Sequence, residues 1–140
     1  MKIPEKNELV GPEPIMLDEE VVLDHFLGLT NDQFLDRLRI SPDTFQEDFM
    51  WMAPPGLRYY LPVVLSWIRE EQTNSWLMSH GLLCSLSFQV ESSELPRDVK
   101  ALIGEIADYI DGRRAKFDLG RDDLLDEYLR KIRTKAEPAL

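Results

Sequence analysis

His80 and Cys84 stand four residues apart, the spacing that lets an imidazole touch a thiol on one face of a helix. A nucleophilic cysteine needs such a base, and the base needs an acceptor that orients it. No Asp or Glu lies between Thr73 and Val90 to supply that acceptor, and Gly81 weakens a continuous helix through the pair. We therefore expect a buried structural cysteine beside a capping or surface histidine, and we assign no catalytic residue.

Glu20, Asp24 and His25 form a second group that could do chemistry, as metal ligands. Glu20 and Asp24 share a helix face at i+4, whereas His25 points about a hundred degrees away, near the apolar stripe. A metal site needs several convergent ligands, so a partly buried structural role is expected for His25. The chain also lacks the H-E-x-x-H, phosphate-loop, G-x-S-x-G and dinucleotide-binding motifs. The sequence thus predicts no metal site and no cofactor.

Arg58 is the only base between Arg39 and Arg69, and it precedes Tyr59 and Tyr60 in the most apolar part of the chain. These three side chains could line a pocket between helices, with the guanidinium binding an anion. Alternatively, the tyrosines pack in the core and the arginine pairs with a nearby acid. We keep Arg58, Tyr59 and Tyr60 as a candidate pocket of a small-ligand-binding or enzymatic domain.

The charge of the chain is unevenly distributed. Residues 1–53 carry 12 acids and 4 bases, whereas residues 97–140 carry 10 of each, within a total net charge of -10. An acidic surface repels phosphate groups, which argues against direct nucleic-acid binding and against anionic membranes. The same surface would attract a basic protein, although acidity can also serve solubility alone. The expected contact residues are Asp18, Glu19, Glu20, Asp24, Asp32, Asp36, Asp43, Glu47 and Asp48, with Trp51 as an apolar anchor.

Apolar side chains recur at helical spacing along most of the 140 residues, a length typical of one domain. Thr30-Asn31-Asp32-Gln33 has the pattern of a capping box, which places a helix start there. The pattern predicts an all-α fold, a compact bundle of five to seven short helices around a central apolar helix at about residues 57–70. We expect an extended N-terminal arm at 1–16 and a frayed tail at 136–140. Residues 75–90 fit a helix or a strand, and helix is favoured because no partner strand is evident.

Cys84 is the only cysteine, which rules out an intramolecular disulfide and favours a reducing compartment. The first 17 residues contain charges and three prolines and no apolar run, so they do not resemble a signal peptide. The apolar stretch 49–68 has the length of a membrane span, but Pro54-Pro55-Gly56 interrupts it. We expect a cytoplasmic protein.

The run Gly56-Leu57-Arg58-Tyr59-Tyr60-Leu61-Pro62-Val63-Val64-Leu65 is similar to a segment in a family of small bacterial proteins that carry a domain of unknown function. In that family a phenylalanine usually precedes an Arg-Tyr-Tyr-Leu-Pro motif on an apolar helix, whereas this chain has Leu57. The resemblance implies a small bacterial cytoplasmic protein. It implies no activity and therefore assigns no catalytic residue.

The small size, the missing catalytic motifs and the acidic first third together favour a binding protein over an enzyme. We expect an acidic protein-binding module, of the kind found in immunity proteins or antitoxins, that inhibits a basic toxin through its N-terminal half. Two alternatives remain open, the small-ligand or enzymatic domain at Arg58 and a structural adaptor or homo-oligomer subunit. The oligomeric state is left open.

Overall fold

The computed structural model describes residues 1–136, and all regular structure in that range is helical. The helices are α1 (Lys6–Leu9), α2 (Leu17–Phe26), α3 (Asn31–Ile40), α4 (Asp48–Trp51), α5 (Pro54–Ile68), α6 (Trp76–Ser92), α7 (Arg97–Gly112) and α8 (Asp123–Ala136). Two 3-10 turns, η1 (Pro42–Phe45) and η2 (Arg114–Phe117), join them. The predicted all-α class is confirmed. The described part has eight α-helices in place of five to seven because α1 and α4 are one-turn helices with no periodic pattern of their own.

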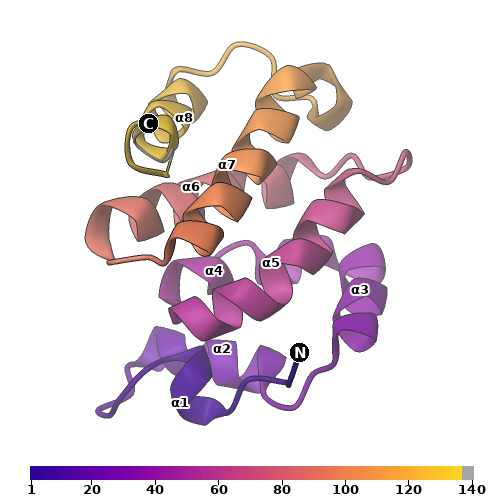
Figure 1. Cartoon of the computed structure of the whole chain (residues 1–140). Coiled ribbons are helices and arrows are strands. Elements are labelled where there is room, and N and C mark those ends of the chain that lie inside the picture. Colours follow the sequence, from indigo (N-terminus) through magenta and orange to yellow (C-terminus); the bar gives the residue numbers. More distant parts are fainter. Residues whose placement is uncertain (137–140) are drawn as a thin grey trace.

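The predicted central apolar helix is α5, which begins with Pro54-Pro55 because prolines lose no hydrogen bond in a first turn. It packs against α1 and α3 on one side and against α7 on another. Figure 1 shows α5 between the N-terminal helices at one end of the molecule and α8 at the other. Buried apolar side chains from both ends form one continuous cluster with it.

Residues 75–90, which fit either a helix or a strand, belong to the single helix α6. The hydroxyl of Ser75 caps its start by accepting from the amide of Met78 at 3.1 Å. Gly81, which lowers helix propensity, lies where the side chain of Gln46 approaches the backbone. The alternating pattern near residue 88 does not make a strand because α4, α7 and α8 surround α6 with helices.

The N-terminal segment is packed where the sequence predicts an extended arm at 1–16. Leu9 is fully buried, and its carbonyl accepts from the amide of Ala53 at 2.6 Å. The carboxylate of Glu8 accepts from the amide of Glu5 at 2.9 Å and closes the one-turn helix α1. The burial of Leu9 and Val10 explains the difference, because two apolar side chains anchor a short segment against α5. Of the predicted frayed tail at 136–140, residues 137–140 lie outside the described part of the chain.

An aromatic cluster joins α2, α3, η1, α4 and α5 near the N-terminal end. Its ring centroids lie 4.7 to 6.2 Å apart, mostly edge to face, an arrangement that aromatic rings prefer. The members are Phe26, Phe34, Phe45, Phe49 and Tyr60. This cluster fixes the ends of α2 and α4 relative to each other. Within residues 1–136, no helix combines the length and the apolar character needed to cross a bilayer.

Candidate functional site

A pair between the partly buried His25 and the buried Asp48 connects α2 to α4. The Nδ1 atom of His25 lies 2.7 Å from Oδ2 of Asp48, and Asp48 is only 4% exposed. The edge of the His25 ring also rests on Phe45, with centroids 5.6 Å apart. Burial raises the pKa of Asp48 to about 6, and the hydrogen bond with His25 opposes that shift. Asp48, predicted as a surface contact, is therefore an internal residue because His25 and the aromatic cluster hold it inside.

Asp48 also borders a depression of about 240 Å³ between α2, η1 and α4, which we call the acidic depression. Four of the acids predicted to contact a partner meet here, although they are spread over 31 residues of sequence. The predicted apolar anchor, Trp51, forms part of the same wall. The lining consists of Asp18, Val21, Asp43, Thr44, Gln46, Glu47, Asp48 and Trp51.

Most of the acids predicted to contact a partner have no ion pair in the described part of the chain. Within residues 1–136, eight of the nine predicted acids, all except Asp48, lie beyond 4.0 Å of any Lys, Arg or His nitrogen. Acids nearer the C-terminus are largely paired, as when Arg133 binds both Asp108 and Asp111. The acidic depression therefore keeps its negative charge, while the opposite end of the molecule neutralises its own.

Trp51 is half-buried, and its position is set by α6. Its ring lies 5.7 Å from that of Phe88, which is itself 41% exposed. Gln89, the next residue of α6, donates to the carbonyls of Phe49 and Met52 at 2.9 and 2.7 Å. Because α4 is held in this way, Trp51 offers a fixed aromatic surface beside the carboxylates.

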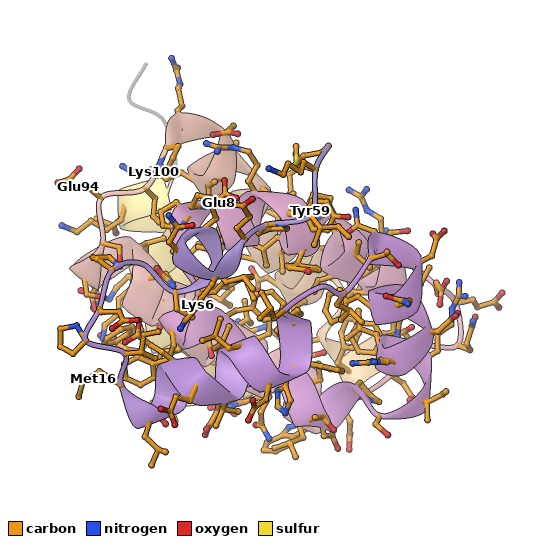
Figure 2. All side chains as sticks on the ribbon, turned by 90° about the horizontal axis from the view of Figure 1, so that it is seen from below. Lys6, Glu8, Met16, Tyr59, Glu94 and Lys100 are labelled. Atoms are coloured by element: carbon orange, nitrogen blue, oxygen red, sulfur yellow. The ribbon has the colours of Figure 1, made fainter. Side chains whose placement is uncertain are left out.

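The remaining predicted acids do not join the acidic depression. Glu20 and Asp24 border a separate hollow with Lys6 of α1, and Figure 2 looks onto the face that carries Lys6 and Met16. The carboxylate of Glu19 accepts from the amide of Met16 at 3.0 Å and so caps α2. Asp32 and Asp36 project from α3 and do not line the depression. The nine predicted acids thus divide into a clustered group and a dispersed group.

Arg58, Tyr59 and Tyr60 do not converge on a pocket, which corrects the candidate pocket predicted there. Tyr60 is fully buried, and its hydroxyl donates to the carbonyls of Phe26 and Leu29 at 3.0 and 2.7 Å. Burial raises the pKa of Tyr60, since the phenolate could not be solvated there. Tyr59 packs edge-on against Tyr60, and Arg58 points to Asp98 with an Nε–Oδ2 distance of 2.7 Å. Helical geometry explains this result, because consecutive residues on α5 face different directions.

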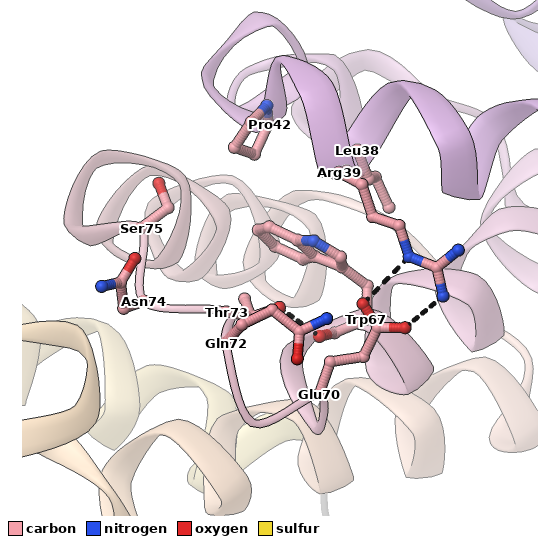
Figure 3. Close-up of a pocket in the computed structure, with 9 residues that line it drawn as sticks. All are labelled: Leu38, Arg39, Pro42, Trp67, Glu70, Gln72, Thr73, Asn74 and Ser75. Carbon is pink, nitrogen blue, oxygen red and sulfur yellow. Dashed lines mark hydrogen bonds and ion pairs between the residues drawn. The ribbon is translucent and has the colours of Figure 1, made fainter.

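Figure 3 shows a different pocket, of about 220 Å³, between α3, η1 and the loop that follows α5. Trp67 forms its wall, and the Thr73 hydroxyl donates to the Trp67 carbonyl at 2.8 Å. Arg39 and Glu70 belong to its lining and form an ion pair with each other at one side of the pocket. Because these two charges satisfy each other, the pocket offers a ligand no unpaired charge.

His80 has an acceptor that the local sequence does not reveal. Its Nε2 lies 3.3 Å from Oδ2 of Asp122, which precedes α8, and its ring stacks on Trp76. Burial, and then the neighbouring Cys84 side chain, raise the pKa of Tyr128 to about 12. Asp122 is 42 residues from His80 in the sequence, and the close packing of α6 on α8 brings the two side chains together.

Two further observations bound the chemistry of these sites. Among residues 1–136, no three His, Cys, Asp or Glu side chains converge as metal ligands. Searches of protein-family models, of curated proteins and of solved structures found no match to this chain, so the geometry described above is what supports a functional proposal.

Proposed function

We propose that this protein is a binding module that takes a Lys or Arg side chain of a basic protein partner into the acidic depression. The observation that carries the proposal is the convergence of Asp18, Asp43 and Glu47 around Trp51, with no ion pair to any base in residues 1–136. Carboxylates that stay unpaired in a hollow keep their interaction energy for a cation from outside.

The lining of the depression suits a long cationic side chain. The carboxylates would pair with its charged head, and the Trp51 ring would contact it through a cation–π interaction. Val21, which is exposed in the same hollow, offers apolar surface to the methylene stem. The excess of acids in residues 1–53 would also speed the encounter with a basic partner.

Among basic partners, we propose a toxin that the protein inhibits in the manner of an immunity protein or antitoxin. Such complexes associate fast because the charges of the two proteins are complementary. In this chain, the exposed acids of the acidic depression form no ion pairs with bases of residues 1–136 and can therefore attract a basic partner. In this proposal the protein acts in the cytoplasm, where the single thiol of Cys84 stays reduced.

The experiment is a pull-down from host cells with three versions of the full chain. The test variant combines Asp18→Asn, Asp43→Asn and Glu47→Gln, which removes three charges from the depression. The matched control combines Asp32→Asn, Asp36→Asn and Glu71→Gln, which removes three exposed charges elsewhere. The captured partner is identified, purified and titrated against each version at low and at high salt.

We expect a basic partner whose affinity for the test variant falls by about tenfold or more, since charged hydrogen bonds are lost. The control should bind almost as tightly as the wild-type chain, and added salt should weaken all three complexes. Equal loss of affinity in both variants would assign the binding to net charge alone. A partner that binds the test variant at wild-type affinity would refute the proposal.

A further inference from the structure

Arg37 is the one base in residues 1–53 that has no carboxylate within 4.0 Å in the part of the chain that the structure describes. Lys2 and Lys6 pair with neighbouring glutamates, and Arg39 pairs with Glu70. The nearest acceptor to the Arg37 guanidinium is the carbonyl of His25, at 3.5 Å, which is a long contact for a hydrogen bond. The N–H groups of the Arg37 guanidinium therefore remain available to an anion from outside the chain.

The unpaired Arg37 borders a pocket of about 280 Å³, which we call the α2–α3 pocket. Its floor is the buried ring of Phe45, and its rim includes Ile40, which is 81% exposed. Polar residues also line the same hollow, namely Asp24 and His25 of α2, Ser41 and Thr44. The pocket thus combines an apolar body with a few convergent polar groups, as small-ligand sites do.

His25 enters the α2–α3 pocket in a fixed orientation. Its Nδ1 is held by Asp48 at 2.7 Å, and its ring is held by Phe45. The Nε2 atom is therefore the ring nitrogen left for a ligand, and within residues 1–136 it has no hydrogen-bond partner. A buried carboxylate behind an imidazole fixes the tautomer and orientation of the ring, which prepares Nε2 for one defined partner.

We propose that the α2–α3 pocket binds a small carboxylate with a short apolar body. Arg37 would bind the carboxylate in a bidentate manner, and Phe45 and Ile40 would contact the apolar body. A planar guanidinium matches the two oxygens of a carboxylate, and Asp24 in the same lining disfavours a more highly charged anion such as phosphate. The pocket volume of about 280 Å³ lies just below the usual range for ligand pockets, which begins at about 300 Å³, so the ligand is a small molecule.

Asp24, on the edge of the same pocket, allows two sources of that carboxylate. A simple branched acid such as isovalerate presents the carboxylate alone. A branched amino acid such as leucine adds an ammonium group, which could donate a hydrogen bond to the carboxylate of Asp24. The site adjoins the acidic depression but shares only Thr44 of its lining, so the inference does not depend on the proposed protein partner.

The test is a titration of the full chain at pH 7, followed by nitrogen–proton correlation spectra that include the side-chain Nε–Hε of arginine. Isovalerate, leucine and isobutylamine are added in turn, with sodium chloride at equal ionic strength as the blank. Isovalerate has about seven non-hydrogen atoms, so its Kd is expected to be roughly millimolar. We expect saturable shifts at Arg37, His25 and Phe45 with isovalerate or leucine and none with isobutylamine.

Arg37→Gln is the decisive variant, and Arg97→Gln is its matched control. Arg97 is an exposed arginine in the first turn of α7, so its loss removes the same charge away from the pocket. We expect Arg37→Gln to weaken binding by about tenfold or more and Arg97→Gln to leave it unchanged. Because Arg37 is exposed, its variant should keep the wild-type thermal midpoint.

The comparison of ligands has defined outcomes. Tighter binding of leucine than of isovalerate would support the proposal and assign the ammonium group to Asp24. Tighter binding of isovalerate would support it and identify a simple acid as the ligand class. The proposal is overturned if neither carboxylate gives saturable shifts at the pocket, if isobutylamine binds best, or if Arg37→Gln binds as well as the wild type.

Discussion

The 2.7 Å contact between Nδ1 of His25 and Oδ2 of Asp48 forms a common wall between two surfaces of the molecule. Asp48 borders the acidic depression, and His25 borders the α2–α3 pocket. Any proton held by this pair is therefore within reach of both hollows. A cation docked beside Asp48 would favour its ionised form, and the resulting charge would act on the imidazole that faces the other side.

Asp48→Asn should gain stability relative to the wild type as pH rises from about 4 to about 6. The folded-state pKa of Asp48 is about 6, against an ordinary value of 3.8. Between these values the unfolded chain releases a proton that the folded protein retains, so wild-type stability falls as pH rises, whereas asparagine has no proton to release. The relative gain should be on the order of 2 kcal/mol. Urea unfolding at several pH values, followed by circular dichroism, measures it.

The exposed acid Asp32 provides the control for this experiment. The free energy of unfolding of Asp32→Asn, relative to the wild type, should change little across the same interval. A difference between wild type and Asp48→Asn that stays constant from pH 4 to pH 6 would show that Asp48 ionises as readily in the folded protein as in the unfolded chain.

Tyr60→Phe should lower the free energy of unfolding by about 1–2 kcal/mol. The Tyr60 hydroxyl is the donor for the carbonyls of Phe26 and Leu29, where α2 ends, and both bonds are buried. Phenylalanine keeps the ring and removes that donor. Tyr59→Phe is the matched control, because within residues 1–136 the Tyr59 hydroxyl makes no hydrogen bond; its effect should be small. Chemical denaturation of both variants at one pH checks the difference, and equal effects would contradict the assigned role.

Features that depend on neighbouring residues could be predicted from the sequence. The capping box at Thr30 forms as expected, since the amide of Gln33 donates to the Thr30 hydroxyl at 3.2 Å and the amide of Thr30 donates to the Gln33 side chain at 2.9 Å. These partners are three residues apart, so the helix start alone brings them together. The periodicity of α5 similarly indicates a core helix before any packing is known.

Features that depend on packing between distant segments could not be predicted. His25 and Asp48 are 23 residues apart, and their contact follows from the aromatic cluster that joins α2 to η1 and α4. The same limit applies to the acceptor of His80, since Asp122 lies in the segment before α8. Whether an acid forms an ion pair also depends on the direction of every basic side chain. The periodicity of the sequence does not specify these directions. For the same reason, the sequence does not predict the α2–α3 pocket. Nothing in the sequence indicates that Arg37 has no carboxylate partner.

Gly81→Ala should destabilise the protein even though alanine is the better helix former. A Cβ atom added at Gly81 would lie 2.7 Å from Oε1 and 2.8 Å from Cβ of Gln46. The Cβ atom of Gln46 is bonded directly to the backbone, so it can move away only if the backbone of Gln46 moves too. The helix-propensity gain of about 1 kcal/mol is smaller than the cost of overpacking, about 1–3 kcal/mol. Gly104→Ala on α7 meets no atom within 4 Å and should stabilise by about 0.5–1 kcal/mol. Thermal unfolding of the two variants should therefore shift in opposite directions.

Gln89→Met should release α4 from α6 and expose the surface that carries Trp51. The Gln89 amide group donates to the carbonyls of Phe49, Met50 and Met52 at 2.9, 3.1 and 2.7 Å, and methionine matches its length without a donor. Leaving buried carbonyls unpaired costs about 1–3 kcal/mol, and the cost falls on a helix of one turn that has little stability of its own.

The measurement for this variant is hydrogen exchange of the peptide that spans α4, read by mass spectrometry. Ser87→Ala is the control, because among residues 1–136 the Ser87 hydroxyl bonds only within α6, to the Cys84 carbonyl at 2.7 Å. We expect faster exchange across α4 in Gln89→Met and wild-type exchange in the control, with α7 unchanged in both. Protection of α4 that survives the loss of Gln89 would mean that the aromatic cluster alone positions Asp48 and Trp51.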